Sequence, residues 1–190
     1  MAKIETLLQL LSHQIEFQKR LGNPIPNGIV SFECVKESLS QNLYQMIEQQ
    51  EFLEANEEER KEELIDVLLF MVNKYIFLGV YEEVQKCGDT RFDRLLWEMP
   101  SCQSFCQCDS LARLEQNNYI TLIREHCTFK PWKARKSEEC ASRQWARVYF
   151  YKALDLFYQM ANIVFADNDE FIHYLNKKLN INIDRQDSGY

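Results

Sequence analysis

Glycine and proline are scarce in this chain, at five and four of 190 residues. Both residues interrupt helices, so the usual helix breakers are nearly missing. Leu, Glu, Gln and Lys, which form helices well, are common instead. With 46% hydrophobic and 27% charged residues, the chain is expected to be globular and long enough to bury a core. The composition therefore predicts an all-α protein.

Long apolar runs are missing as well. No run reaches the roughly 18 residues that a membrane-spanning helix needs. The opening residues MAKIETLLQLL include an acidic residue and polar breaks, which is typical of an amphipathic helix rather than a signal peptide. The seven cysteines are then expected to be reduced thiols in a cytoplasmic protein. No membrane partner is expected.

An excess of positive charge is the third absence. The net charge is −7, which argues against a nucleic-acid partner. The charges are unevenly distributed: residues 44–66 hold nine acids and two bases, and residues 124–152 hold eight bases and three acids. The first segment could collect cations and the second could meet anions. Two solvated helix faces are the plainer alternative.

Apolar residues recur at helical spacing along most of the chain. The predicted helices cover residues 3–20, 32–55, 58–78, 81–98, a stretch from about 111, and 137–165, with a last helix that starts at Asp167 or Asn168 and enters the tail. Residues 98–110, EMPSCQSFCQCDS, form the predicted linker. Its cysteines could bind zinc with Cys87 or with His126 and Cys127, but the paired knuckles of zinc sites are lacking. Reduced thiols in a linker are the preferred interpretation.

Two stretches hint at an internal repeat. DVLLFMVN (66–73) and DLFYQMAN (155–162) each place Asp and Asn seven residues apart in an apolar helix. We therefore predict a single domain over residues 1–190, a helical bundle built from two helical-hairpin repeats. Residues 1–85 would be a metal-binding half, and residues 110–190 a degenerate second half with a phosphate-binding tail.

The predicted second half lacks most of the acids of the first. Asn118, Thr121 and Lys152 stand where acids would be needed, and only Asp155 is kept. This hairpin is expected to close the pocket and to add positive charge, including that of Lys152.

Four acids carry the predicted chemistry. Glu48 and Glu51 are three residues apart and share a helix face, as do Glu63 and Asp66. Two antiparallel helices joined by a short polar turn would bring the pairs together. Converging carboxylates repel one another unless cations lie between them, and oxygen ligands without His select Mg²⁺ or Mn²⁺. An ordinary acidic helix surface is the alternative.

Asp66 and Glu63 interrupt an otherwise apolar helix, which predicts that this helix is buried. Asn73 lies two turns from Asp66 and on the same face. Apolar walls with a few placed polar groups are what a base-binding pocket needs.

The pattern Glu-x-x-Glu, a connection, Glu-x-x-Asp and an apolar helix with Asn resembles the all-α nucleoside triphosphate pyrophosphatases, which include the dimeric dUTPases, the phage dCTPases and the MazG-like proteins. The ending KLNINIDRQDSGY is similar to the Lys-Asn-x-x-Asn-x-x-Arg-Gln-x-x-Gly-Tyr ending of the dimeric dUTPase and phage dCTPase branch. The segments QIEFQKRLG (14–22) and FKPWK (129–133) also look like family segments. Leu179 replaces an Asn of the pattern, and Leu69 stands where family members often have His.

The resemblance implies Mg²⁺-dependent hydrolysis of a deoxynucleoside triphosphate, dUTP first, to the monophosphate and pyrophosphate. Glu48, Glu51, Glu63 and Asp66 would hold Mg²⁺, for which Mn²⁺ can substitute, and Glu48 or Glu51 would orient or deprotonate the attacking water. A homodimer is implied as well. The implied substrate-binding residues are Gln14, Gln18, Asn73, Lys130, Trp132, Lys133, Lys178, Asn182, Arg185 and Tyr190.

Two alternatives remain at this point. The substrate could be dCTP or a modified pyrimidine nucleotide. The protein could also be a catalytically silent relative that senses nucleotides or engages a partner, which Leu69 and Leu179 favour. The four acids argue against a silent protein, since binding alone does not require mutually repelling carboxylates.

Overall fold

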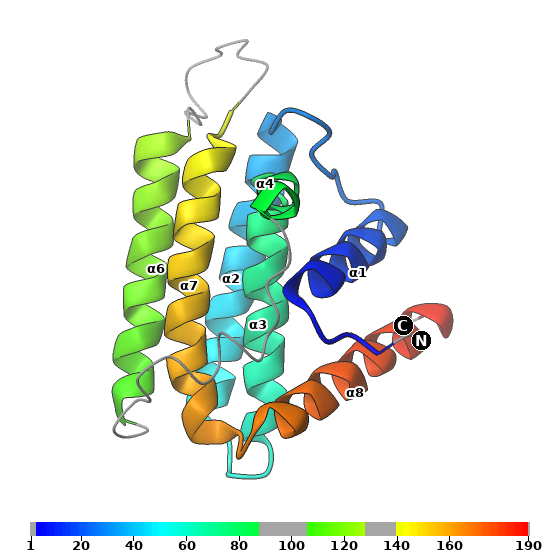
Figure 1. The fold of residues 1–190 in the computed structure, drawn as a ribbon, viewed down its shortest axis with the longest axis vertical. Helices are drawn as coiled ribbons and strands as arrows, with labels where there is room; N and C mark the ends of the chain where they lie inside the picture. Colours follow the sequence, from blue (N-terminus) through cyan, green and yellow to red (C-terminus); the bar gives the residue numbers. More distant parts are fainter. Residues whose placement is uncertain (1–2, 88–105, 128–139, 190) are drawn as a thin grey trace.

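The computed structural model describes residues 3–87, 106–127 and 140–189 of the chain (Figure 1). Within these residues the protein forms α-helices and two isolated β-bridges, and no strand. The prediction of an all-α fold is confirmed. The helices are α1 (Leu7–Arg20), α2 (Phe32–Glu54), α3 (Arg60–Ile76), α4 (Val80–Cys87), α6 (Cys106–His126), α7 (Arg143–Val164) and α8 (Asn168–Asp187).

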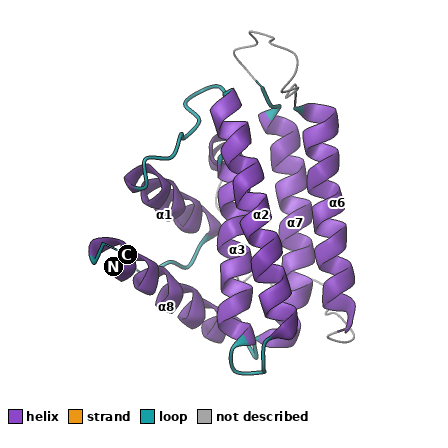
Figure 2. Cartoon of the chain, turned by 180° about the vertical axis from the view of Figure 1, so that it is seen from behind, coloured by secondary structure: helices purple, strands orange, loops and turns teal. Residues whose placement is uncertain are grey.

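Four long helices, α2, α3, α6 and α7, lie side by side as a bundle (Figures 1 and 2). A short turn joins α2 to α3, and these two helices form the first hairpin. The second hairpin is formed by α6 and α7. Helix α3 contributes eleven buried residues out of 17, because its sequence is apolar nearly all round. The arrangement of two hairpins agrees with the expected bundle, whereas their origin as repeats stays a prediction.

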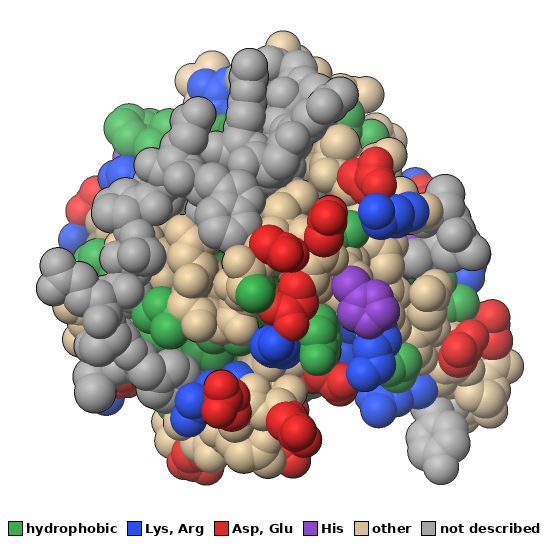
Figure 3. All heavy atoms as spheres, turned by 60° about the horizontal axis from the view of Figure 1, so that its bottom comes forward, with side chains coloured by type: hydrophobic (Ala, Val, Ile, Leu, Met, Phe, Trp, Pro, Cys, Tyr) green, Lys and Arg blue, Asp and Glu red, His purple; other side chains and the backbone are tan. Residues whose placement is uncertain are grey.

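Helices α1 and α8 lie outside the bundle, on the side of α3 away from α6 (Figure 1). Asn176 of α8 fixes the start of the described chain: its Oδ1 accepts from the Ile4 N–H (2.8 Å), and its Nδ2 donates to the Ile4 carbonyl (3.0 Å). Ion pairs of Lys61 with Glu170 and of Lys177 with Glu62 hold α8 on α3. Acidic and basic side chains are interspersed on this end of the molecule (Figure 3).

The ends of several helices follow from local sequence. Thr6 and Gln9 form a capping box at the start of α1. Asp167 caps α8 by accepting from the Glu170 N–H at 2.8 Å, as expected. Gly79 follows α3 with φ of 77°, and a Cβ there would lie 2.7 Å from Cδ of Arg143. A side chain at this position would therefore displace the Arg143 side chain, and the positive φ itself favours glycine.

A buried polar cluster joins the two hairpins. Lys74 of α3 is fully buried, and its Nζ donates to Glu115 of α6 (2.7 Å) and to Asn42 of α2 (3.0 Å). Gln45 donates to the second carboxylate oxygen of Glu115 (2.9 Å). The Lys74 ammonium also lies 4.4 Å from the ring centroid of Tyr119. Both charges are thus neutralised and hydrogen-bonded inside the bundle.

Some predicted boundaries were wrong. The linker 98–110 was expected to be irregular, but α6 already begins at Cys106. The helix expected at 137–165 begins at Arg143, because its N-cap Ser142 is extended and Cys140 donates its N–H to the Val30 carbonyl (2.7 Å). Of the helix expected at 81–98, the part beyond Cys87 lies outside the described residues.

Among the described helices, none alone is both long and apolar enough to cross a membrane; only α3 and α4 taken together pass that test, and they are bent by 90°.

Candidate functional site

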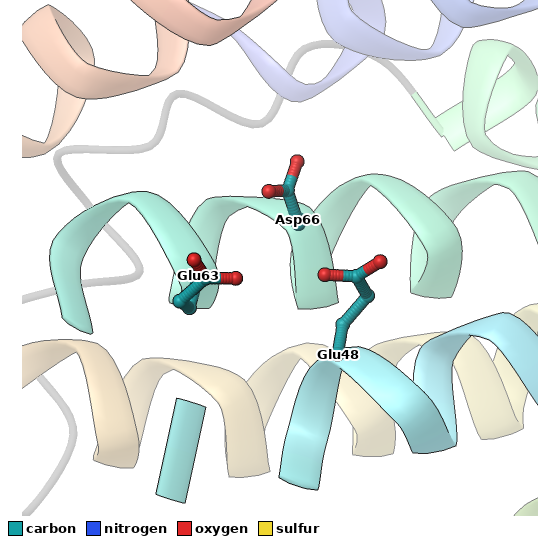
Figure 4. A group of neighbouring side chains, drawn as sticks. All are labelled: Glu48, Glu63 and Asp66. Carbon is teal, nitrogen blue, oxygen red and sulfur yellow. The ribbon is translucent and has the colours of Figure 1, made fainter. Parts of the chain in front are cut away.

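Three carboxylates converge where α2 and α3 pack against each other. Glu48 projects from α2, and Glu63 and Asp66 project from α3, with oxygen atoms that all lie within 4.8 Å of one another (Figure 4). The spacing of Glu63 and Asp66 puts both on one face of α3, and the antiparallel hairpin brings Glu48 opposite them. In the described part of the chain this is the one group of acidic, His or Cys side chains with the geometry to hold a metal ion.

The ionised forms of the three carboxyl groups are destabilised in this cluster, so their pKa values are raised. Burial raises the pKa of Glu48 to about 7, and the charges of Asp66, Glu51 and Glu63 add to that effect. Burial and neighbouring acids also raise the pKa of Glu63 and of Asp66. The positive charge of Lys178 lowers the pKa of all three carboxyl groups and so offsets part of these effects. A hard divalent cation would relieve the remaining repulsion, so the donor set fits Mg²⁺ or Mn²⁺.

Glu51 was expected to be the fourth member of this group. Its side chain is exposed, it does not line the cavity described below, and it lies outside the set of three. Its charge nevertheless raises the pKa of Glu48 and of Glu63. Three residues rotate an α-helix by about 300°, so Glu51 lies about 60° around α2 from Glu48, at the exposed rim of the cluster.

Helix α8 brings positive charge to the acids. Lys178 forms an ion pair with Asp66, and each side chain is only 14% exposed. Asn182 and Arg185 follow at four and seven residues further along α8 and line the same cavity as Lys178. The tail is helical as far as Asp187, which is why the three side chains share a face.

The cavity has a volume of about 670 Å³ and lies between α1, α2, α3 and α8. This volume is within the range of small-molecule sites. Its acidic end is formed by Glu48 and Asp66, and its basic side by Lys178 and Arg185. Tyr44 and Phe70 lie in its wall with ring centroids 5.5 Å apart. A ligand that carries both phosphate and an aromatic ring fits these surroundings.

Most of the described site residues expected from the sequence are brought together here. Those that line the cavity are Glu48, Asp66, Gln14, Gln18, Asn73, Lys178, Asn182 and Arg185. Gln14, Gln18 and Asn73 are buried, at 3–4% exposure, and supply amide groups. Four expected residues, Lys130, Trp132, Lys133 and Tyr190, lie outside the described residues.

The second hairpin was expected to close the pocket, and this was wrong for the described residues. None of the residues that line the cavity belongs to α6 or α7. Lys152 is exposed, with its Nζ 4.7 Å from the Tyr149 ring centroid. Helices α1 and α8 close the pocket instead, because α7 packs on the opposite side of α3.

Sequence reasoning missed the residues of α2 that precede Glu48. Gln41, Tyr44 and Glu37 all line the cavity, and Phe70 of α3 was not singled out either. A signal was present: Gln41 and Tyr44 precede Glu48 by seven and four residues, which places them on its helix face.

Comparisons of the chain with models of known protein families, with curated proteins and with solved structures gave no match.

Proposed function

We propose that the protein is a Mg²⁺-dependent pyrophosphatase that hydrolyses a deoxynucleoside triphosphate, dUTP first, to the monophosphate and pyrophosphate. One observation carries the proposal: two of the clustered carboxylates, Glu48 and Asp66, and a row of basic and amide side chains on α8 line a single cavity of about 670 Å³. A nucleoside triphosphate needs both, since its phosphates are held by cations and by Lys or Arg.

Glu48, Glu63 and Asp66 would hold the metal, and Glu51 stands at the edge of the group. When bound, Mg²⁺ would polarise the phosphate and lower the pKa of a water molecule. Mn²⁺ would serve in its place, because it prefers the same oxygen ligands.

The side chains of this chain have distinct roles in the proposed reaction. Lys178 and Arg185 neutralise the charge that grows on the phosphates, and Asn182 donates to a phosphate oxygen. Glu48 or Glu51 orients the water and takes its proton while the water oxygen bonds to the α-phosphorus. The bond from that phosphorus to the bridging oxygen breaks, and pyrophosphate leaves with the electron pair. The raised pKa of Glu48, about 7, suits a proton acceptor near neutral pH.

The base would enter the end of the cavity that is lined by side-chain amides. Gln14, Gln18 and Asn73 can donate and accept hydrogen bonds there. The segment with Lys130, Trp132 and Lys133 would cover the nucleotide, and Tyr190 would bind the substrate, as the resemblance implies. The resemblance also implies the homodimer, and α2 exposes Leu43, Met46 and Ile47 next to the cavity residue Tyr44.

A catalytically silent protein that senses nucleotides is the second candidate. The observation that favours it is the ion pair between Lys178 and Asp66, which satisfies one of the three acids without a metal. A silent protein would bind nucleotides in the same cavity and leave the phosphates intact.

Pyrophosphate release tests the proposal. Purified protein is given dUTP, dCTP, dTTP, dATP and dGTP in turn, with Mg²⁺, with Mn²⁺ and with a chelator. We expect turnover of a pyrimidine nucleotide that requires the metal and is lost in Asp66→Asn, and the exposed Glu54→Gln variant of α2 serves as the matched control. Nucleotide binding without turnover of any of the five would favour the silent protein.

A further inference from the structure

We propose that Gln41, held in one orientation by Glu37, reads an N–H group on the Watson–Crick edge of the bound base, an inference that rests on the proposed nucleotide site. The side chain of Gln41 lines the cavity and is 5% exposed. Its carbonyl oxygen is buried and has no hydrogen-bond partner among the described residues. A buried acceptor without a hydrogen bond costs free energy, so a ligand that donates a hydrogen bond to this oxygen would be favoured.

The orientation of the Gln41 amide follows from its neighbour. Gln41 Nε2 donates to Glu37 Oε1 at 2.9 Å, one helical turn earlier on α2. An ionised carboxylate accepts hydrogen bonds and donates none, so the amide NH₂ must face Glu37. The carbonyl oxygen is then forced to the other side. Glu37 is therefore a positioning residue, and Gln41 presents an acceptor and not a donor to the ligand.

The register of α2 on α3 places Gln41 at a defined distance from the carboxylates. Two facing pairs follow one another along the hairpin, Glu48 with Asp66 and Tyr44 with Phe70. Gln41 and Asn73, three residues further on each of these helix faces, line the same cavity. Each step along α2 in one direction is matched by an equal step along α3 in the other. Seven residues of α-helix rise about 10 Å, so the amide level lies about that far from the acids.

The order of these levels matches the parts of a nucleotide. Acids for the metal and phosphates come first, aromatic rings follow at the middle level, and amides come last. The rise between the first and last levels is comparable with the reach of a nucleotide from its α-phosphorus to the far edge of its base. Asn73 supports the assignment, because its Oδ1 is also buried without a partner among the described residues.

The ligand group that satisfies Gln41 is an N–H of a pyrimidine. Uracil supplies N3–H and cytosine supplies its 4-amino group, and both are donors on the same edge. The 2-pyrimidinone base has neither donor and is no larger than either, so it probes the hydrogen bond without a steric clash. A site built to hydrogen-bond a group rejects an analogue that lacks it.

The test compares kcat/KM for dUTP, dCTP and the 2-pyrimidinone deoxynucleoside triphosphate in the wild type, three variants and a control. In the wild type, the better of the two natural substrates should exceed the analogue by about tenfold or more. Gln41→Leu should reduce this ratio to near one. Glu37→Ala should lower the ratio in part, because the Gln41 amide is then free to rotate. Glu37→Gln can still accept a hydrogen bond from Gln41, so its ratio should lie between that of Glu37→Ala and that of the wild type.

The matched control is Gln50→Leu. Gln50 donates to Glu54, so the two form an exposed pair of the same kind on the same helix. This variant should keep the wild-type ratio. A ratio that stays the same in Gln41→Leu, or that falls equally in Gln50→Leu, would overturn the assignment of Gln41.

Calorimetric binding of the three corresponding monophosphates separates this inference from the proposed function. If the protein prefers the natural monophosphates over the analogue, loses this preference in Gln41→Leu and turns over no triphosphate, the role of Gln41 is supported and the proposed hydrolysis is contradicted. Turnover with no dependence of discrimination on Gln41 would contradict the reading of the base alone. Absence of both binding and turnover would overturn both.

Discussion

The protein contains two clusters of shielded charge on α3, and they are organised in opposite ways. Around Lys74, an ammonium and a carboxylate are enclosed, and the ammonium and both carboxylate oxygens of Glu115 have hydrogen-bond partners. Around Asp66, three carboxylates converge with Lys178 as the nearby opposite charge. The first cluster is electrostatically satisfied by the chain itself. The second is not, and such repulsion is retained where a ligand relieves it.

The largest effect should come from breaking the satisfied cluster. Lys74→Met leaves the Glu115 carboxylate buried without its partner, which should lower the free energy of unfolding by about 3–5 kcal/mol. The double variant Lys74→Met/Glu115→Met, which replaces both charges by apolar groups, should recover most of this loss. Urea denaturation measures both. Equal losses in the single and double variants would show that the ion pair is not what joins the hairpins.

The opposite result is expected for the unsatisfied cluster. Glu63→Gln removes a carboxylate whose pKa is raised, so stability should be unchanged or higher. Pyrophosphate release should nevertheless fall on the order of 100-fold, because one oxygen ligand of the metal is weakened. The two measurements together distinguish a functional acid from a structural one. A variant that loses stability and activity in parallel would place Glu63 with the structural group.

Removal of the tail should affect activity and spare the fold. Truncation after Asp184 deletes Arg185 and five further residues, of which those described, 185–189, do not contribute to the buried core. We expect kcat/KM to fall by about tenfold or more, since one charged contact to phosphate is lost. The helical circular dichroism should stay nearly the same. Normal turnover by the truncated protein would exclude a phosphate role for Arg185.

The smallest effect is a pH dependence of stability. The pKa of Glu48 is about 7 in the folded protein and near 4.5 when unfolded, so between these values the folded state holds a proton that the unfolded state lacks. Without divalent ions, Tm should therefore fall as pH rises from 5 to 8. Saturating Mg²⁺ should reduce that slope, because binding of the ion to the ionised group stabilises the folded state.

Glu48→Gln is the control for this pH dependence, because it removes the titrating group. Its Tm should depend less on pH over the same interval. A wild-type protein whose Tm rises steadily across this interval without metal would contradict the raised pKa of Glu48.

Features that depend on the spacing of residues along one helix could be predicted from the sequence. Glu63 and Asp66 meet because they are three residues apart, and Lys178 and Asn182 share a face because they are four apart. The all-α fold followed from the same periodicity and from the scarcity of helix breakers. These interactions are local in the chain, so one helix determines them.

Features that depend on packing between helices could not be predicted from the sequence. The exposure of Glu51 depends on the rotation of α2 against α3, and spacing alone gave it the same role as Glu48. The closing of the cavity by α1 and α8, and the presence of Gln41 and Asn73 in one cavity wall, depend on contacts between distant segments. The start of α7 at Arg143 reflects the bond from Cys140 to Val30, more than 100 residues apart in the chain.

The most direct test of the account is equilibrium binding of Mn²⁺ followed by electron paramagnetic resonance. The wild type and the exposed variant Glu54→Gln should bind Mn²⁺ at a site that dUMP and pyrophosphate perturb, and Glu48→Gln/Asp66→Asn should lose that binding while remaining folded. Equal Mn²⁺ binding by all three proteins would show that these carboxylates do not form a metal site, and the proposed chemistry would fail with it.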